Sequence, residues 1–202
     1  SDNPQTLKIV GIIAAVIVLL LLVAVVSGVI GNEEPGNEYG DPQVSGQLPL
    51  MPQESRVDAS VNGETSPTVI GQDFDDNEVR IENDGRAKAI VLLAHWCGFC
   101  QNEVPAVQAW LNAGGGVDGV DMYSVSTAMD SNRDNFPPSE WLDREGWTVP
   151  VVRDDSSNSI HTAYGSGGFP FWVFVNSDGT VAFRVAGATT VEELELIMGE
   201  LN

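Results

Sequence analysis

The most constraining feature of this chain is the stretch from Ala89 to Trp110, in which an apolar run breaks at two cysteines and continues with a helical pattern. Residues 90–93 are consecutive and apolar, as in a strand that is buried on both faces. After the break, apolar side chains recur at positions that fit one face of a helix: Val104, Val107, Ala109 and Leu111. The sequence therefore predicts that Cys97 lies at a strand-to-helix turn.

This position favours redox chemistry at Cys97. The unpaired amides of a first helical turn and the positive end of the helix dipole stabilise an anion, and the thiolate is the reactive form of cysteine. Cys100 follows one turn later on the same helix face, close enough to form a disulfide with Cys97. We therefore expect Cys97 to attack and Cys100 to resolve the mixed disulfide, without a cofactor.

Other roles for the two cysteines have less support. A structural zinc site needs four ligands, and beyond this pair the chain offers only His95 and His161, so we expect no metal. An inert structural disulfide is the other alternative. We expect His95 to be an exposed loop residue rather than a cation that stabilises the Cys97 thiolate, and we assign His161 no role.

The N-terminal region predicts a membrane anchor. Residues 9–30 carry no charge and are dominated by Ile, Val, Leu and Ala, which is long enough to cross a bilayer as a helix. A cleaved signal peptide would have a shorter apolar region. Because Lys8 precedes the span and acidic residues follow it, residues 1–8 are expected to be cytoplasmic and the domain extracytoplasmic, at the cell membrane.

The remaining chain divides by composition. Residues 31–66 are rich in polar residues, Gly and Pro, with few apolar residues, so we expect a flexible acidic linker there and a globular domain over residues 67–202. The net charge of −20, with nine Lys and Arg in total, argues against nucleic acid as a partner.

Within residues 67–202, segments typical of strands and helices alternate. Strands are expected at 68–74, 78–81, from residue 89, at 119–127, at 149–152 and in a hairpin that turns at Ser177–Gly179; helices are expected after Cys97, around Trp141, at 157–164 and from a capping box at Thr190 and Glu193. The pattern predicts an α/β fold with a central mixed β-sheet flanked by helices.

Two motifs carry a family resemblance. The run AHWCGFCQNEVP, Ala94 to Pro105, resembles the A-x-W-C-x-x-C-x-x-E-x-P signature of membrane-anchored thioredoxin-like oxidoreductases of the ResA and TlpA type. The run YGSGGFPFWVFVNSDG, Tyr164 to Gly179, is similar to a later segment of the same family. The resemblance covers most of residues 67–202 and implies a thioredoxin-like fold there.

The same resemblance implies that Pro170 is a cis-proline beside the cysteines. The backbone of Phe169 would then face Cys97 and contact an extended substrate segment. The alternative is that Pro170 is the ordinary first residue of a strand. Trp96 is expected to shield the disulfide and to form a flat contact surface beside it.

The chain departs from the thioredoxin pattern at Val91, where many thioredoxins carry a buried acid. Glu103, which matches the family's glutamate, shares a helix face with Cys100 and is expected to accept its proton. The alternative is that Glu103 is an acid stabilised only by the helix dipole.

The resulting functional hypothesis is a membrane-tethered, extracytoplasmic thiol-disulfide oxidoreductase that exchanges disulfides with protein substrates. Related anchored proteins mostly act as reductants, including in cytochrome c maturation. One alternative is a non-catalytic thioredoxin-fold interaction module of a membrane complex. A thiol peroxidase is disfavoured, because the peroxidatic cysteine follows a Thr or Ser by three positions and Ala94 stands there.

Overall fold

The structure, a computed structural model, describes residues 38–202. The predicted membrane span at residues 9–30 and the first part of the predicted linker lie outside the described residues. Within residues 38–202, none of the helices combines the length and the apolar character that crossing a membrane requires.

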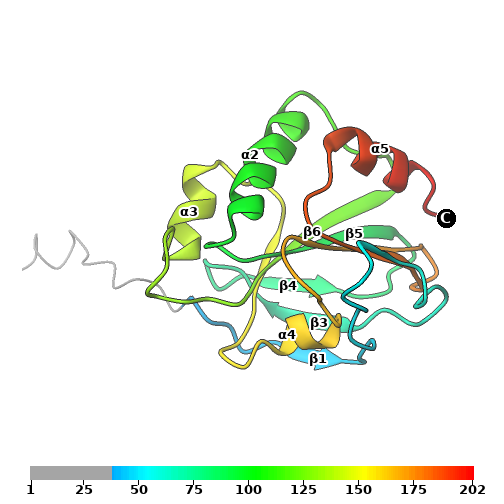
Figure 1. Cartoon of the computed structure of the whole chain (residues 1–202), viewed down its shortest axis with the longest axis horizontal. Helices are drawn as coiled ribbons and strands as arrows, with labels where there is room; N and C mark the ends of the chain where they lie inside the picture. The colour runs from blue at the N-terminus through cyan, green and yellow to red at the C-terminus, as the bar shows by residue number, and fades with distance from the viewer. Residues whose placement is uncertain (1–37) are drawn as a thin grey trace, which may run out of the picture. The chain divides into compact units, whose positions relative to one another are not determined.

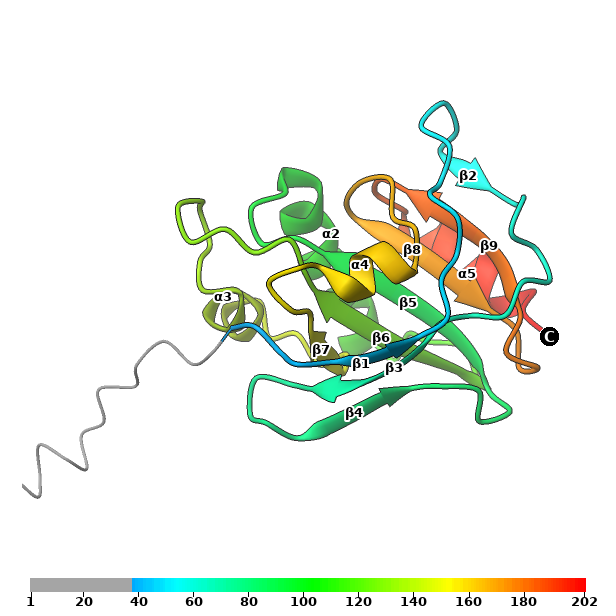
Figure 2. The same cartoon turned by 90° about the horizontal axis from the view of Figure 1, so that it is seen from below.

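A six-stranded mixed sheet forms the centre of the domain (Figures 1 and 2). Its strands lie in the order β2 (Val57–Asp58), β9 (Val181–Ala186), β8 (Phe171–Val175), β5 (Ala87–Leu93), β6 (Val120–Ser126) and β7 (Val151–Arg153). Strand β6 pairs parallel with both β5 and β7, whereas β8 pairs antiparallel with both β5 and β9. The predicted central mixed sheet is therefore confirmed.

Strand β5 is buried along its whole length, which explains its unbroken apolar run. Successive side chains point to opposite faces of a sheet. Accordingly, Ile90 and Leu92 belong to one apolar core, while Ala89, Val91 and Leu93 belong to the other. The strand thus joins both cores and delivers the chain directly to the cysteine pair.

Helices cover one face of the sheet, and a mixed layer covers the other (Figure 1). Helices α2 (Gly98–Asn112), α3 (Pro138–Arg144) and α5 (Val191–Gly199) share one core with the sheet. On the opposite face lie α4 (Ser159–Ala163) and a three-stranded antiparallel sheet of β1 (Gln43–Ser45), β3 (Thr68–Gln72) and β4 (Glu78–Ile81). The predicted capping box at Thr190 and Glu193 is present and begins α5.

Residues 38–66, which we call the N-terminal strap, correct the linker prediction. The strap contributes β1 and β2, which pair with β3 and β9. Its few apolar side chains are buried, with Leu48, Met51 and Val61 at most 2% exposed. A flexible linker is therefore wrong for residues 38–66, because backbone pairing and a small number of well-placed apolar groups order a segment of low apolar content.

The fully buried guanidinium of Arg184, on β9, ties the strap to the core. It forms an ion pair with Asp58 and donates to the carbonyl oxygens of Pro49 (2.8 Å) and Tyr164 (2.9 Å). Gly165 lies beside this site with a φ of +62°, and a Cβ there would overlap the Pro49 carbonyl oxygen. Glycine at this position therefore allows the strap to approach the end of α4 closely.

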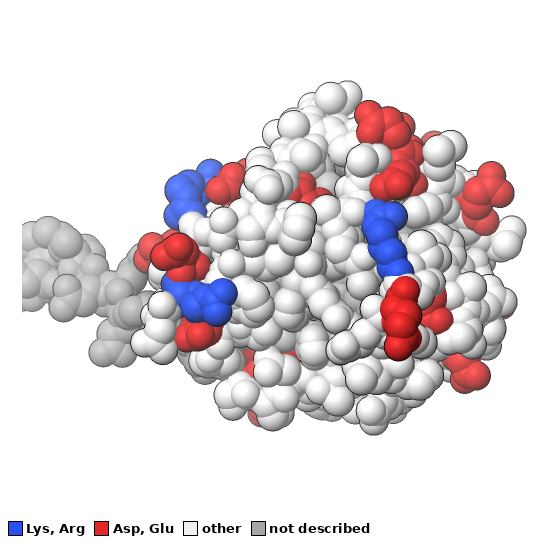
Figure 3. All heavy atoms as spheres, viewed as in Figure 1, with Lys and Arg blue, Asp and Glu red and all other residues white. Residues whose placement is uncertain are grey.

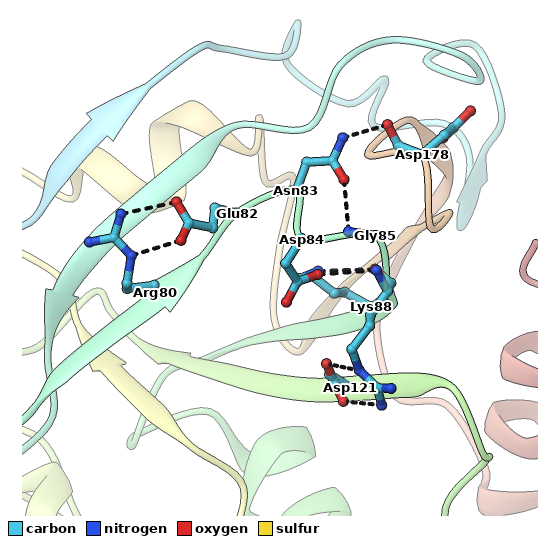
Figure 4. Close-up of polar contacts among 9 residues, drawn as sticks. Arg80, Glu82, Asn83, Asp84, Gly85, Lys88, Asp121 and Asp178 are labelled. Atoms are coloured by element: carbon cyan, nitrogen blue, oxygen red, sulfur yellow. Dashed lines mark hydrogen bonds and ion pairs between the residues drawn. The ribbon is translucent and has the colours of Figure 1, made fainter.

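Polar contacts fix the start of β5 (Figure 4). The side chain of Asn83 donates to the carbonyl oxygen of Asp178 at 2.7 Å, which links the β4–β5 turn to the β8–β9 turn. The buried ammonium of Lys88 pairs with Asp84 in the same turn. Together these contacts fix the N-terminal end of β5, the strand that leads to the cysteines.

Acidic side chains lie beside the few basic ones on the face shown in Figure 3. Several basic groups of the described residues form ion pairs at 4.0 Å or less: Arg56–Glu193, Arg80–Glu82, Arg86–Asp121, Arg153–Asp76 and Lys88–Asp84. Most of the positive charge is thus compensated locally by the acidic surface.

We predict that Asp58→Ala destabilises the domain strongly, because it leaves the buried Arg184 guanidinium without its counter-ion. Breaking a buried ion pair at one partner typically costs about 3–5 kcal/mol. The free energy of unfolding, measured with urea, should fall by that order in Asp58→Ala and change little in Asp75→Ala, which removes an exposed carboxylate. Equal stability of Asp58→Ala and the parent protein would show that the ion pair does not stabilise the strap.

Candidate active site

Cys97 occupies the predicted strand-to-helix turn. It is the N-cap residue of α2 with extended backbone angles (φ −77°, ψ 116°) and is 9% exposed. Its own amide donates to the carbonyl oxygen of Ala94 at 2.9 Å, and its carbonyl accepts from the Gln101 amide at 3.0 Å. The sulfur is therefore presented at the start of the helix, where the first-turn amides point toward an anion.

The segment before β8 forms the other side of the site. The Phe169–Pro170 peptide bond is cis, as the resemblance implied. The carbonyl oxygen of Phe169 lies 3.5 Å from Cys97 Sγ, although the two residues are 72 positions apart in the chain. The fold thus brings together the two motifs that the sequence singled out.

Cys100 lies behind Cys97 and is fully buried. Both cysteines are free thiols. Burial raises the pKa of the Cys100 thiol well above its usual range, and the nearby Cys97 and Glu103 raise it further. The pair is therefore asymmetric, with one sulfur near the surface and a second that holds its proton.

Glu103 is buried at 5% exposure on the second turn of α2. Its Oε1 accepts hydrogen bonds from the backbone amide of Thr189 (2.7 Å) and from the indole of Trp172 (3.1 Å). Its Oε2 accepts none from any residue that the structure describes. Glu103 therefore does not resemble a solvent-exposed acid at a helix terminus.

The environment of Glu103 tunes it for proton exchange near neutrality. Burial raises its pKa to about 7, against the opposing effect of the hydrogen bonds from Thr189 and Trp172. An acid with a pKa near the ambient pH can both accept and release a proton. Glu103 follows Cys100 by three positions on α2, so the two side chains share a helix face, and Glu103 adds to the rise in the pKa of the Cys100 thiol.

Trp96 and Phe169 form an aromatic rim beside Cys97. Their rings make an edge-to-face contact with centroids 5.9 Å apart. The Trp96 indole donates to the carbonyl oxygen of Ala128 at 2.7 Å, and the guanidinium of Arg133 lies 4.5 Å above its ring. Trp96 is held in place rather than free to rotate, as a contact surface beside the cysteines requires.

The expectation that His95 is exposed is wrong, because its ring is 1% exposed. Nε2 accepts from the amide of Asp130 (3.1 Å), and Nδ1 lies 2.8 Å from the carbonyl oxygen of Asp134, to which the neutral ring donates. Burial lowers the pKa of His95, so the neutral form is favoured. His95 therefore orders the loop after β6 and supplies no positive charge to the site.

Three residues near the site were missed by sequence reasoning. His161 packs its ring against Phe169, with centroids 5.2 Å apart, although it was assigned no role. Trp172 and Thr189 bind Glu103 from 69 and 86 positions away. No local pattern shows such contacts, because they depend on how β8 and the loop before α5 pack against α2.

The donor set of the site does not suggest a metal centre. Among residues 38–202, no group of three or more His, Cys, Asp or Glu side chains is arranged to hold an ion.

The pKa of Glu103 predicts a pH dependence of stability. A carboxyl whose pKa is raised from 4.5 to about 7 on folding favours the folded state below pH 4.5, and this contribution is lost as the pH rises to about 7. The loss is about 3 kcal/mol. Gln does not titrate. As the pH rises from 4.5 to about 7, the unfolding free energy of reduced Glu103→Gln should therefore increase relative to that of the reduced parent by about 3 kcal/mol, measured with urea.

Glu192→Gln provides the control, because Glu192 is an exposed glutamate of α5. Its unfolding free energy should follow the parent protein across the same pH range. If Glu103→Gln also follows the parent, Glu103 titrates as an ordinary solvated acid.

Comparison with known proteins identifies the family. The profile of the Redoxin family matches residues 62–196. The thiol-disulfide oxidoreductase ResA of Bacillus thuringiensis is 24% identical over 134 residues, which cover 66% of this chain and 74% of that protein. The protein of the same name from Oceanobacillus iheyensis is 26% identical over 190 residues, covering 92% and 84% respectively.

Solved structures support the fold. StoA from Bacillus subtilis is similar with a TM-score of 0.52 at 23% identity, covering 62% of this chain and 91% of that one. A thiol:disulfide interchange protein of the thioredoxin family from Chlorobium tepidum has a TM-score of 0.54 at 17% identity, covering 68% and 94%. The predicted thioredoxin-like fold is thereby confirmed. The chain belongs to the Redoxin family, as a thioredoxin-like protein of the ResA and TlpA type.

Proposed function

We propose that this protein is a thiol-disulfide oxidoreductase that reduces disulfides of extracytoplasmic proteins while tethered to the membrane by residues 9–30. The observation that carries the proposal is the asymmetric pair, in which Cys97 caps α2 opposite the Phe169 carbonyl and Cys100 is buried behind it. The position of Cys97 suits nucleophilic attack, and that of Cys100 suits the later, intramolecular step.

This geometry supports the following reaction. The Cys97 thiolate attacks one sulfur of a substrate disulfide, which forms a mixed disulfide and releases the first substrate thiolate. Cys100 then transfers its proton to Glu103 and attacks Cys97 Sγ, so that the second substrate thiolate leaves. The protein ends with a Cys97–Cys100 disulfide, the substrate gains two electrons, and its two thiolates take up protons.

A protein substrate suits the surface around Cys97. Phe99, between the two cysteines in sequence, is 66% exposed, and the rim of Trp96 and Phe169 lies beside Cys97. Exposed aromatic groups of this kind are enriched where proteins bind one another. The backbone of Phe169 would bind an extended substrate segment by β-augmentation.

The groups around Cys100 favour its protonated form, as expected of a resolving thiol that waits for the mixed disulfide. A strongly stabilised thiolate makes a thioredoxin-fold protein oxidising. Here the charges acting on Cys100, from Cys97 and Glu103, both raise its pKa, and the buried His95 is favoured in its neutral form. Together with burial, these groups disfavour a thiolate at Cys100. The reductant direction is supported by the resemblance to ResA-type proteins.

The proposed membrane tether and cellular role are supported by the sequence and by the family resemblance. The uncharged run at residues 9–30 supports an anchor, and Lys8 before it supports an extracytoplasmic domain. The resemblance to ResA-type proteins supports disulfides of apocytochromes c as one substrate class. Membrane fractionation and protease protection of the full chain would test the tether separately from the chemistry.

We expect Cys97→Ser to abolish the reduction of insulin disulfides by this protein, because no other thiol is near the surface of the site. Cys100→Ser should retain the first step and accumulate a mixed disulfide, detectable by mass spectrometry of the intact complex. A control Ser45→Ala variant, at an exposed position of β1 on the opposite side of the central sheet from α2, should reduce insulin at the parent rate. Insulin reduction by Cys97→Ser at the parent rate would contradict the proposal.

The direction of electron flow has its own test. The reduction potential, measured by equilibration with glutathione, should lie nearer the roughly −270 mV of thioredoxin than the roughly −120 mV of a strong oxidant. A value at the oxidising end would show that the protein donates disulfides instead.

A further inference from the structure

One basic side chain of the domain lacks an acidic partner. Every Lys and Arg of residues 38–202 except Arg133 has a carboxylate oxygen within 4.0 Å of its charged group. This exception is unexpected in a chain with a net charge of −20, in which carboxylates are abundant. Arg133 is exposed, and its guanidinium lies over the Trp96 ring, 4.5 Å from the ring centroid.

The Arg133 guanidinium lies at the aromatic rim of the cysteine site. Trp96, which it covers, precedes Cys97 in the chain and packs edge-to-face against Phe169. The carbonyl oxygen of Phe169 lies 3.5 Å from Cys97 Sγ. A substrate segment bound along the Phe169 backbone therefore lies beside the same indole that carries the guanidinium.

The loop that carries Arg133 is held in place by the buried His95. The His95 ring accepts a hydrogen bond from the Asp130 amide (3.1 Å) and donates to the Asp134 carbonyl oxygen (2.8 Å), so it binds the loop on both sides of Arg133. The Arg133 amide donates to the Asp130 carbonyl oxygen at 3.1 Å, which closes a turn. A backbone that is already ordered loses less conformational entropy when its side chain binds a partner.

The acidic residues of this loop do not pair with the guanidinium. The Asp130 carboxylate accepts hydrogen bonds from the amide and the side chain of Asn132, at 3.0 and 3.1 Å. It attracts Arg133 from a longer distance than an ion pair. The Asp134 carboxylate likewise forms no ion pair with Arg133. The N–H donors of the guanidinium are therefore free of carboxylate partners among residues 38–202.

We propose that Arg133 is a specificity-determining residue that binds a side-chain carboxylate close to the disulfide of a protein substrate. The inference rests on the proposed function and selects, among its substrates, those with Asp or Glu near the reactive cysteine. An arginine can form two parallel hydrogen bonds with a carboxylate while it remains stacked on an aromatic ring. The acidic surface elsewhere repels such a segment, which confines the attraction to the rim beside Cys97.

Arg133 acts on substrate binding and takes no part in the sulfur chemistry. A charge at the rim of an interface changes the rate of association and the dependence of that rate on salt. The preference for an acidic segment should therefore be seen in the rate at which the mixed disulfide forms. It should weaken as ionic strength rises, because salt screens charges at the surface.

The test is a competition between two peptides for the reduced full-length protein, which is supplied in substoichiometric amount so that each molecule reacts once. Each peptide is acetylated and amidated and holds one intramolecular disulfide, and the two differ in a single Asp or Asn near one cysteine. A set of such pairs moves this residue through the positions on either side of the cysteine. After alkylation of the new thiols, mass spectrometry gives the ratio of the two kcat/KM values.

At low ionic strength and at the best position, the parent protein should prefer the Asp peptide about fivefold, which is the size of a favourable surface ion pair. Arg133→Gln should lose this preference and should reduce the Asn peptide within about twofold of the parent rate. Arg133→Lys should keep part of the preference, because Lys retains the charge without the two-bond geometry.

Arg80→Gln provides the matched control. Arg80 is an exposed arginine of β4, on the opposite side of the central sheet from α2, and its replacement removes the same charge. The preference of Arg80→Gln for the Asp peptide should equal that of the parent protein, which separates a local contact from an effect of net charge.

Equal reduction of both peptides by the parent protein at every position would overturn the inference, as would an Asp preference that Arg133→Gln retains. Equal slowing of both peptides in Arg133→Gln would also overturn it, because Arg133 would then serve to hold Trp96 and not to select substrates. If the parent protein reduces neither the peptides nor insulin, the proposed function itself fails, and the inference fails with it.

Discussion

The burial of one carboxyl group is the constraint around which the interior of this site is arranged. Glu103 lies where α2, β8 and the loop before α5 meet, and each of these elements contributes a group that touches or acts on it. The Trp172 indole and the Thr189 amide both donate to Oε1, which lowers the free-energy cost of burying the carboxyl group. Oε2 has no hydrogen-bond partner among the described residues. The acid is thereby kept in the range where it can exchange a proton with the thiol beside it.

No positively charged group is among the causes of the raised pKa of Cys100. The acidic surface pairs with much of the basic content of the chain, including the buried Arg184 and Lys88. His95 is adjacent to the cysteine motif in sequence, yet its two ring nitrogens are used by backbone groups of a single loop. Desolvation is therefore the main influence on Cys100, without a cation to offset it.

The sequence was sufficient to predict the central sheet and the cysteine site, because both depend on local patterns. The apolar run of β5, the turn at Cys97 and the capping box of α5 are each visible in a few consecutive residues. The N-terminal strap was not predictable in this way, since its order depends on pairing with β3 and β9 and on Arg184, more than 100 positions away from Asp58. The same holds for Thr189, whose amide binds Glu103 on a helix 86 positions earlier in the chain.

The path of the strap has a mechanical consequence. Glu38 accepts hydrogen bonds from the amide and hydroxyl of Ser139 at the start of α3, and the next residue, Tyr39, donates to the carbonyl oxygen of Met129 at 3.3 Å. The neighbouring Ala128 holds the indole of Trp96. A tensile force applied to the chain ahead of residue 38 therefore acts first on the start of α3 and on the loop that holds Trp96.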